Sequence, residues 1–362
     1  MRTFVRSGLA PRIVFGSGTL SQVREEAAAL GAGNVLVLST SRQAGLAERV
    51  ERQLGEMYAG TFAQAEEHTP VEVTDRALGL LHDLGADCVI SIGGGSTTGL
   101  GKAIALRTGV PQVAVPTTYA GSEVTAVLGE TTSGQKTTMS SPEVLPETVI
   151  YDVDLTLTLP WDVTLTSAVN AMAHCVEALY SPDAPTNVGP SVGSSVTGQA
   201  VESIRVIARN LPELKRDLHD LDARTEVLYG AWLAGACLAS VEMALHHKLC
   251  HTLGGSFSLP HSPTHAVVLP YAMAYNAPAA GVAMEQIAIA MGVPDAPSGM
   301  QDLIRSLGGP TSLGQLGLGV DDIERAVELA MTKAYPNPRE VTAEGLRDLL
   351  TRAQKGQHLP RC

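Results

Sequence analysis

Short, continuously apolar runs alternate with amphipathic stretches up to about residue 150, and this alternation limits the possible folds more than any other feature. Asn34–Thr40, Asp87–Ile92 and Gln112–Pro116 have the length and apolar content of buried strands. Between them, Arg42–Leu54 and Val73–Leu84 have helical spacing. Strands that are apolar throughout and separated by helices indicate a parallel sheet covered by helices on both faces.

The end of this α/β pattern is marked by two further segments. Val127–Ser140 is rich in threonine around Ser133 and Gly134, which predicts a β-hairpin. Thr148–Tyr151 is expected to be the last strand.

After about Pro160 the strand-like runs almost disappear, and apolar residues recur at helical spacing. The predicted helical segments are Asp162–Tyr180, Pro190–Arg209, Arg224–Leu253, Pro263–Tyr275 and Gly299–Leu307. We therefore expect two domains: an α/β domain over residues 1–159 and an all-helical domain over residues 160–362.

Charge and cysteine content narrow the function classes. The formal net charge is −12 and there is no long run of lysine or arginine, so binding to nucleic acid is not expected. The five cysteines form no CxxC pair, which favours reduced thiols in a cytoplasmic protein. No stretch has the roughly 20 uncharged apolar residues of a membrane span, and none resembles a signal peptide.

A glycine-rich segment directly follows one predicted strand. Gly93, Gly94, Gly95 and Ser96 stand between Asp87–Ile92 and a helix that Ser96 could cap. Glycines let a pyrophosphate approach the backbone, and the N–H groups and positive end of the helix favour an anion. A plain tight turn is the alternative explanation of this segment.

The next predicted strand also ends in polar residues, with Thr117, Thr118 and Ser122 in the run PTTYAGSE. Both loops are expected at the carboxyl edge of the sheet, where open α/β sheets bind ligands. An ordinary turn with Ser122 as a cap remains the alternative. The first strand ends in Ser39, Thr40 and Ser41 rather than in a G-x-G-x-x-G loop.

Five of the ten histidines fall within one stretch of twenty residues: His246, His247, His251, His261 and His265. On a helix that ends near Gly254, His247 and His251 are one turn apart and share a face. His246 is expected to point elsewhere and to have a structural role. His261 is predicted in a connecting loop before Pro263, with His265 in the first turn of the following helix.

Asn170 and His174 form another pair four residues apart, in Leu165–Tyr180. Helical pairs of this spacing together with a loop histidine are typical of divalent metal sites, because imidazole binds zinc, iron and nickel well. A single helical histidine is more often a satisfied core or surface residue. The pair and the cluster together favour an active site.

These motifs resemble the iron-containing alcohol dehydrogenase superfamily over nearly the whole chain. The similarity lies in GGGS followed by Lys102, in PTTYAGSE, in SAVNAMAHCVEALYS and in HHKLCHTLGGSFSLPHSPTHAVVLPYAMAYN. The resemblance implies an N-terminal dinucleotide-binding α/β domain, an all-helical catalytic domain and the fold that this superfamily shares with dehydroquinate synthase. It also implies a homodimer.

The resemblance suggests specific site residues. The four metal-ligand positions, usually one Asp and three His, are Asn170, His174, His247 and His261, and His251 matches a further histidine near nicotinamide and substrate. The catalytic set is expected to be Asn170, His174, His247, Lys248, His251 and His261. Contacts to the cofactor are expected at Ser39, Thr40, Gly93, Gly94, Gly95, Ser96, Thr117, Thr118, Ser122 and Lys136.

Two departures from the superfamily pattern point to one of its branches. Asn170 replaces the only anionic ligand, so we expect a divalent cation to bind less well and a metal not to be required. Gly99 replaces the acid of the GGGSxxD pattern. Both features resemble the maleylacetate reductase branch, whose members reduce maleylacetate to 3-oxoadipate in bacterial breakdown of resorcinol, hydroxyquinol and chlorinated aromatics.

The nature of the cofactor and the chemistry follow from that resemblance. Ser39, Thr40 and Ser41 carry no acid that would repel a 2′-phosphate, and Arg42 is close, so NADH or NADPH could be used. Hydride addition to the dianionic substrate develops an enolate, which needs hydrogen-bond donors and a proton source. Lys248 and the histidines are expected to supply them.

Three other functions stay open at this stage. A metal-dependent alcohol or diol dehydrogenase of the same superfamily is the main alternative, although Asn170 argues against it. A lyase of the dehydroquinate synthase type would use NAD without net turnover. A non-catalytic binding protein would keep the loops but has little reason to keep the histidine positions.

Overall fold

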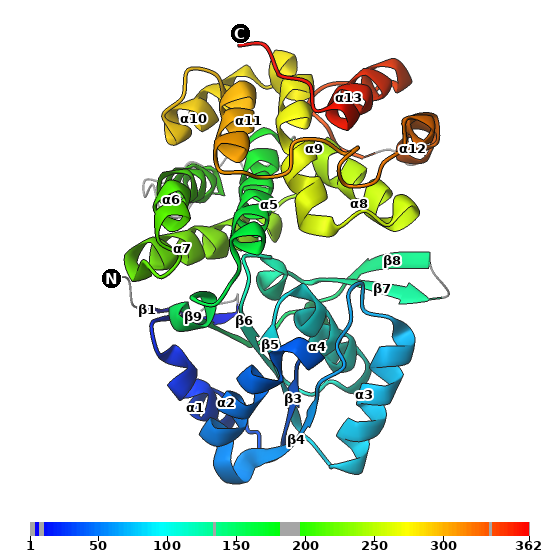
Figure 1. Cartoon of the computed structure of the whole chain (residues 1–362). Coiled ribbons are helices and arrows are strands. Elements are labelled where there is room, and N and C mark those ends of the chain that lie inside the picture. The colour runs from blue at the N-terminus through cyan, green and yellow to red at the C-terminus, as the bar shows by residue number, and fades with distance from the viewer. Residues whose placement is uncertain (1–3, 7–10, 133–134, 182–195, 333–334, 362) are drawn as a thin grey trace. The chain divides into compact units, whose positions relative to one another are not determined.

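The computed structural model describes residues 4–6, 11–132, 135–181, 196–332 and 335–361, with only the backbone given for residues 4–6 and 135–136. The chain divides into two compact units, residues 1–159 and 160–362, and each is described by itself (Figure 1). None of the described helices is both long and apolar enough to cross a membrane.

The first unit contains a seven-stranded sheet with the strand order β1-β2-β9-β6-β5-β3-β4. Its strands are β1 (Phe4–Arg6), β2 (Arg12–Gly16), β3 (Val35–Leu38), β4 (Tyr58–Phe62), β5 (Cys88–Gly93), β6 (Gln112–Pro116) and β9 (Thr148–Asp152). β1 is antiparallel to β2, and the remaining pairs are parallel. β7 (Val127–Thr132) and β8 (Gln135–Ser140) form the predicted hairpin as a separate two-stranded sheet.

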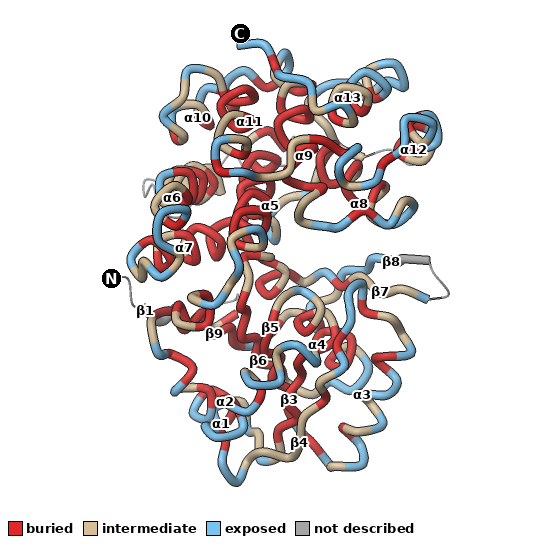
Figure 2. Tube along the Cα trace, viewed as in Figure 1, coloured by how far each residue is buried: buried red, intermediate tan, exposed pale blue. Residues whose placement is uncertain are grey.

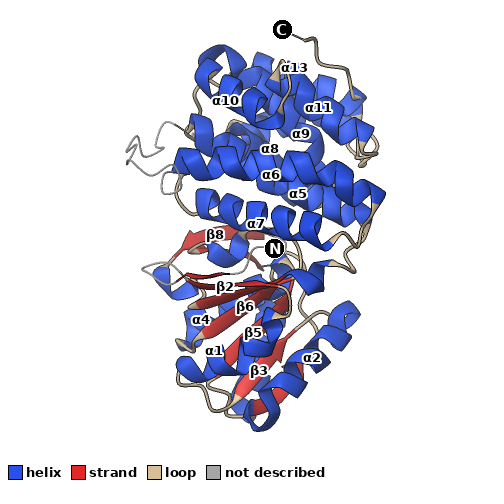
Figure 3. Cartoon of the chain, turned by 90° about the vertical axis from the view of Figure 1, so that its left-hand side faces the viewer, coloured by secondary structure: helices blue, strands red, loops and turns tan. Residues whose placement is uncertain are grey.

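Helices cover both faces of this sheet because successive side chains of each strand point to opposite sides. Val35 and Val37 pack in one core with α1 (Val23–Ala29) and α2 (Ala44–Leu54). Leu36 and Leu38 pack in another core with α3 (Val71–Asp83) and α4 (Gly95–Thr108). Figure 1 shows the strands between these two helix layers, and Figure 3 shows the sheet in red among the helices in blue. The predicted doubly covered parallel sheet is confirmed.

The strand order places a ligand edge at the end of β5. The chain runs from β3 outward to β4 and then returns across β3 to β5, so the order reverses between β3 and β5. Open α/β sheets bind ligands outside the carboxyl ends of the strands at such a reversal. The ends of β3, β5 and β6 are neighbours here, and all three carry the polar loops found in the sequence.

The strand predictions agree with the structure to within about two residues, but some elements were not predicted. β2, β4 and α1 were missed, since they are short or carry a mixed polar pattern. Ser96 does not cap a helix. It lies inside α4, and Gly94 is the N-cap without a side-chain hydrogen bond.

The second unit is helical throughout its described part, as predicted. Its helices are α5 (Trp161–Tyr180), α6 (Val196–Arg216), α7 (Leu221–Leu238), α8 (Leu245–Phe257), α9 (His261–Asn276), α10 (Gly281–Met291), α11 (Ala296–Ser306), α12 (Ile323–Ala330) and α13 (Ala343–Lys355). α5 packs against α6, α7 and α9 and is buried along almost its whole length (Figure 2).

Three predictions of helix boundaries in this unit were wrong. The stretch Arg224–Leu253 is two helices, because α7 ends at Leu238 and α8 starts at Leu245. Apolar spacing continues on both sides of the break and therefore does not reveal it. α8 continues to Phe257, past the predicted end near Gly254. His261 begins α9 instead of lying in a loop, and the start of the predicted segment Pro190–Arg209 lies outside the described residues.

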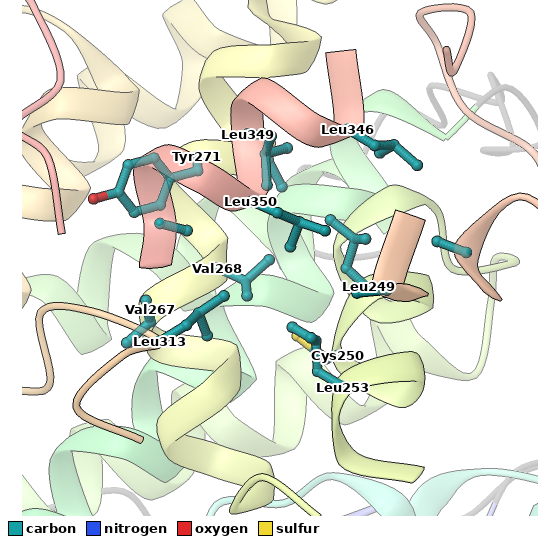
Figure 4. Close-up of a cluster of buried hydrophobic side chains, with 14 of the residues drawn as sticks. Leu249, Cys250, Leu253, Val267, Val268, Tyr271, Leu313, Leu346, Leu349 and Leu350 are labelled. Carbon is teal, nitrogen blue, oxygen red and sulfur yellow. The ribbon is translucent and has the colours of Figure 1, made fainter. Parts of the chain in front are cut away.

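A hydrophobic core fixes α8 and α9 against each other. Leu249 and Leu253 from α8 belong to the same buried cluster as Val268 from α9, together with Leu346 and Leu350 from α13 (Figure 4). All five side chains are buried. The same two helices carry five of the histidines, so this core helps to hold them in place.

Candidate active site

The glycine loop of the first unit is shaped for close approach of a ligand. Gly93 has a φ of 149°, and a Cβ atom there would lie 2.7 Å from both Gln43 Oε1 and Thr97 Oγ1. A Cβ atom on Gly95, the first residue of α4, would meet nothing within 4 Å. This open space at the N-terminus of a 14-residue helix fits the diphosphate of a dinucleotide.

Hydrogen bonds join this loop to the neighbouring strand ends. The Thr117 N–H donates to the Gly93 carbonyl at 2.8 Å. Gln43 Nε2 donates to Thr117 Oγ1 at 3.1 Å, and Thr40 Oγ1 donates to Gln43 Oε1 at 3.3 Å. The predicted residues at the ends of β3, β5 and β6 are therefore brought together. Gln43, which links them, was missed because a lone glutamine carries no sequence signal.

The remaining predicted cofactor residues differ in their surroundings. Ser39 is buried and donates to the Thr40 carbonyl at 3.2 Å. Thr118 lies against Gly94, since a Cβ atom there would be 3.2 Å from its Oγ1 atom. The Ser122 hydroxyl is buried and has no hydrogen-bond partner among the described residues. The side chain of Lys136 lies outside those residues.

Lys102 anchors the loop that precedes the hairpin. Its buried ammonium donates to the carbonyls of Ser122, Thr125 and Val127 at 2.6, 2.7 and 2.8 Å, and lies 3.0 Å from Thr125 Oγ1. Burial lowers the pKa of Lys102 to about 7, although the nearby Glu123 opposes this shift. The side chain has a structural role that the sequence motif alone did not show.

In the second unit, six imidazoles from three helices form one continuous cluster, the histidine cluster. Its members are His174 from α5, His246, His247 and His251 from α8, and His261 and His265 from α9. Ring centroids lie 5.0 Å apart for His174–His247, 5.0 Å for His247–His265, 4.8 Å for His246–His265 and 4.3 Å for His261–His265. The structure thus brings together all the predicted histidines.

The expected arrangement along α8 is only partly correct. His247 and His251 share a face as predicted, with ring centroids 6.1 Å apart, but His247 is buried and His251 is exposed. The prediction that His246 points elsewhere is wrong. Its ring is fully buried against His247 and His265, because α8 enters the cluster at its first turn and is enclosed there by α5 and α9.

The interior members of the cluster are held neutral. Burial, followed by the neighbouring imidazoles, lowers the pKa of His174 and His265 well below the usual value. The same two causes lower the pKa of His246 to about 3. A neutral imidazole keeps one lone pair, which is the form that accepts a hydrogen bond or binds a metal.

Several buried polar atoms of the cluster have no hydrogen-bond partner among the described residues. They are Asn170 Oδ1, His174 Nδ1, His247 Nε2 and both ring nitrogens of His265. Buried polar atoms are rarely left unpaired, so these atoms indicate a ligand. Asn170, His174 and His247 are three of the four metal-ligand positions implied by the family resemblance, and amide oxygen and imidazole nitrogen are possible ligands of a divalent cation. Among the described residues, the ligand atoms of His246, His247 and His265 lie within 4.8 Å of one another and form another possible set.

Glu177 was not predicted, yet it organises the start of α8. It is fully buried on α5, and its carboxylate accepts hydrogen bonds from the N–H groups of Ala244 at 2.8 Å and His246 at 2.7 Å. It also lies 2.7 Å from His247 Nδ1. Burial raises the pKa of Glu177, but His247 and these donors outweigh burial and the net pKa is lowered. The spacing His174-x-x-Glu177, one helical turn, was the available signal.

Lys248, the remaining predicted catalytic residue, is half-buried on α8. Its ammonium lies 5.8 Å from the centroid of the Tyr335 ring, a cation–π distance. Its catalytic role stays a prediction.

Comparison with known proteins agrees with the fold. Residues 10–153 match the family model described as iron-containing alcohol dehydrogenase, and residues 164–354 match the C-terminal model of the Fe-containing alcohol dehydrogenase family. Both models describe iron-containing enzymes, so they give no support to the expectation that a metal is not required.

Similar proteins extend over the whole chain. Maleylacetate reductase 1 of Rhodococcus opacus is 53% identical over 99% of this chain and 98% of its own length. The crystal structures of maleylacetate reductase from Agrobacterium tumefaciens and from Rhizobium sp. strain MTP-10005 each have a TM-score of 0.91 and 49% identity, covering 99% of this chain and 100% of theirs. With both halves matched by the family models, the chain belongs to the iron-containing alcohol dehydrogenase family and is an oxidoreductase.

Proposed function

We propose that this enzyme reduces the carbon–carbon double bond of maleylacetate with NADH or NADPH to give 3-oxoadipate, as part of bacterial breakdown of aromatic compounds. The observation that carries the proposal is similarity over nearly the full chain to proteins named maleylacetate reductase. The identity is 53% to the protein of Rhodococcus opacus and 49% to that of Rhizobium sp. strain MTP-10005. The first unit is the proposed cofactor-binding domain, and the second the proposed catalytic domain.

The bound cofactor would supply the hydride. The loop of Gly93, Gly94 and Gly95 would hold its diphosphate through backbone N–H groups at the start of α4, in the open space beside Gly95. Thr117 and Thr118 would flank it, and Ser122 offers a buried hydroxyl without a partner. No carboxylate follows β3, so both NADH and NADPH are proposed.

The histidine cluster suits an anionic acceptor better than a carboxylate-rich site would. The position that usually holds Asp is the neutral amide of Asn170. Glu177 already accepts from two backbone N–H groups and lies 2.7 Å from His247 Nδ1. The cluster therefore adds little negative charge against a dicarboxylate. His251 is exposed, so its ring can exchange protons with water and is suited to deliver the proton that completes the reduction.

A divalent cation would also fit this cluster. Asn170, His174, His247 and His261 would hold it, and it would polarise the ketone of the substrate as a Lewis acid. The uncharged amide should weaken its binding relative to a carboxylate. We therefore propose that reduction proceeds without added metal.

The test is direct: maleylacetate and NADH or NADPH are incubated with the protein, loss of reduced cofactor is followed, and the assay is repeated after dialysis against EDTA. Net oxidation of the cofactor with formation of 3-oxoadipate is expected in both cases. A protein that instead oxidises diols with a higher kcat/KM, and only with Fe²⁺, would contradict the proposal. A homodimer in the cytoplasm is proposed as well, and light scattering tests the oligomeric state.

A further inference from the structure

We propose that Glu177 is a positioning residue that holds His247 as the tautomer protonated on Nδ1, so that Nε2 presents a lone pair to the ligand of the histidine cluster. The inference deepens the proposed function and rests on it for the identity of that ligand. It is carried by the hydrogen bonds of Glu177, His247 and His246, which together leave one arrangement of protons.

The first step concerns the carboxylate itself. Oε2 of Glu177 accepts from the Ala244 N–H at 2.8 Å, and Oε1 accepts from the His246 N–H at 2.7 Å. A backbone N–H can only donate, so both oxygens act as acceptors. These N–H groups belong to the start of α8, whose positive end also favours an anion.

The second step assigns the proton on His247. Its Nδ1 atom lies 2.7 Å from Oε2 of Glu177. A carboxylate only accepts, so Nδ1 is the donor and carries the hydrogen. In the neutral ring Nε2 then has a lone pair, and this atom is buried with no hydrogen-bond partner in the part of the chain that the structure describes. The hydrogen bond from Nδ1 to Glu177 thus determines that Nε2 is an acceptor.

His246 gives an independent argument for the same arrangement. Its Nε2 atom lies 3.1 Å from the backbone carbonyl of His265, which only accepts, so Nε2 carries the hydrogen and Nδ1 the lone pair. That Nδ1 lies 3.4 Å from Nδ1 of His247. Two facing nitrogens at this distance are compatible when only one is protonated, and the proton is then on His247.

The assignment divides the work between the histidines. A neutral His247 accepts at Nε2, toward a cation or a donor group of the ligand, and does not donate there. Delivery of the proton to the substrate then belongs to His251, the exposed member of the pair. The carboxylate of Glu177 accepts both from the start of α8 and from the ring of His247. One side chain therefore fixes the position of the ring and its tautomer.

The first experiment measures the tautomer in the native protein. Protein labelled with ¹⁵N-histidine is studied by long-range ¹H–¹⁵N NMR as purified and after dialysis against EDTA, and His247→Gln assigns the signal. We expect the pattern of an Nδ1-protonated ring in both samples, because a metal on Nε2 leaves Nδ1 protonated. A ring protonated on Nε2, alone or together with Nδ1, would overturn the proposal.

The second experiment removes the carboxylate. In Glu177→Gln the amide N–H₂ faces backbone N–H donors or the ring N–H, so the ring loses its fixed acceptor. We expect kcat for maleylacetate to fall about 10–100-fold, the range for partners that orient a ligand-binding histidine, with an unchanged KM for the reduced cofactor. The NMR pattern of His247 should change as well.

A matched control separates positioning from helix capping. Asp220 caps α7 by accepting from the Ala223 N–H at 3.0 Å, as Glu177 does for α8, but it contacts no histidine of the cluster in the described structure. Asp220→Ala should lower the melting temperature with kcat kept. Wild-type kcat and an unaltered tautomer in folded Glu177→Gln would overturn the proposal.

The two experiments also separate this inference from the proposed function. The tautomer measurement on the native protein needs no substrate. It can therefore contradict the proposed tautomer of His247 even if Glu177→Gln does not fold. Failure of the wild-type protein to reduce maleylacetate would contradict the proposed function, whereas an Nε2-protonated His247 in an active enzyme would contradict only the positioning role.

Discussion

Lys102 in the α/β unit and the histidine cluster in the helical unit are both buried polar groups, but they are satisfied differently. The Lys102 ammonium has four oxygen neighbours at 2.6–3.0 Å, three of them backbone carbonyls. In the cluster, Asn170 Oδ1, His174 Nδ1 and His247 Nε2 have no partner among the described residues. The hydrogen bonds of Lys102 are therefore satisfied within the fold, whereas the unpaired atoms of the second group indicate a ligand.

This difference separates structural from functional polarity. A buried polar group that is fully hydrogen-bonded can be explained by folding alone, because its desolvation is offset by its partners. Unpaired buried atoms cost free energy, and a fold keeps them where a bound ligand completes them. Substitutions at Lys102 should therefore affect mainly stability, and those in the cluster should affect mainly activity.

The largest effect is expected in the cluster. His251→Ala and His247→Ala should each lower kcat/KM for maleylacetate by about 10²–10⁴-fold, the usual contribution of a positioned acid or base, with little change in cofactor binding. Steady-state kinetics measure this. His358→Ala, at an exposed position of the same unit, is the control and should behave like wild type. Near-normal kcat/KM in both cluster variants would contradict the functional role of the histidine cluster, and with it the contrast with Lys102.

The next effect concerns Lys102 and should appear in stability. Lys102→Met leaves the carbonyls of Ser122, Thr125 and Val127 without their shared donor. Each unsatisfied buried group is costly, and we expect the free energy of unfolding to fall by about 2–4 kcal/mol. Urea denaturation measures the change, and Lys355→Met, an exposed lysine, is the control. An unchanged midpoint would show that the carbonyl cage adds no stability.

A third effect tests the open space of the glycine loop. Gly95→Val would place a branched side chain where a Cβ atom meets nothing within 4 Å, which is the space proposed for the diphosphate. The KM for NADH should rise about tenfold or more, since contacts to the phosphates are lost, while thermal unfolding changes little. Gly79→Val, also with open space but in the middle of α3, is the control for helix propensity. Equal cofactor affinity in both variants would contradict the assignment.

The two regions also differ in how much the sequence could predict. The loop from Gly93 to Ser96 is one continuous segment, and its strand–glycine–helix order fixes its position at the sheet edge. The parallel sheet followed from apolar runs for the same local reason. Gln43, which bridges two strand ends, carries no such signal because its role depends on a strand order that spacing does not give.

The histidine cluster needed information that a sequence pattern does not hold. Counting histidines located it, but His246 is buried because His265 of α9 packs against it. Neither that contact nor the break between α7 and α8 was visible in the apolar spacing. The break exists where Glu177 of α5 accepts the free N–H groups of Ala244 and His246, nearly seventy positions away in the chain. Such a long-range capping contact comes from tertiary packing, which periodicity alone does not report.

The smallest expected effect concerns Asn170 and decides how the cluster is completed. Asn170→Asp restores a charged oxygen one helical turn from His174 on α5. The metal content of protein purified without chelator, measured by elemental analysis, should therefore rise several-fold. His358→Ala should leave it unchanged. With Asn170 in place, EDTA should leave most of the maleylacetate reduction intact. The uncharged amide binds a cation weakly, and the imidazoles then contact the substrate directly. If EDTA abolishes the activity and Fe²⁺ or Zn²⁺ restores it, the unpaired buried atoms are ligands of a metal site. The partner that distinguishes the histidine cluster from Lys102 is then a cation and not the substrate.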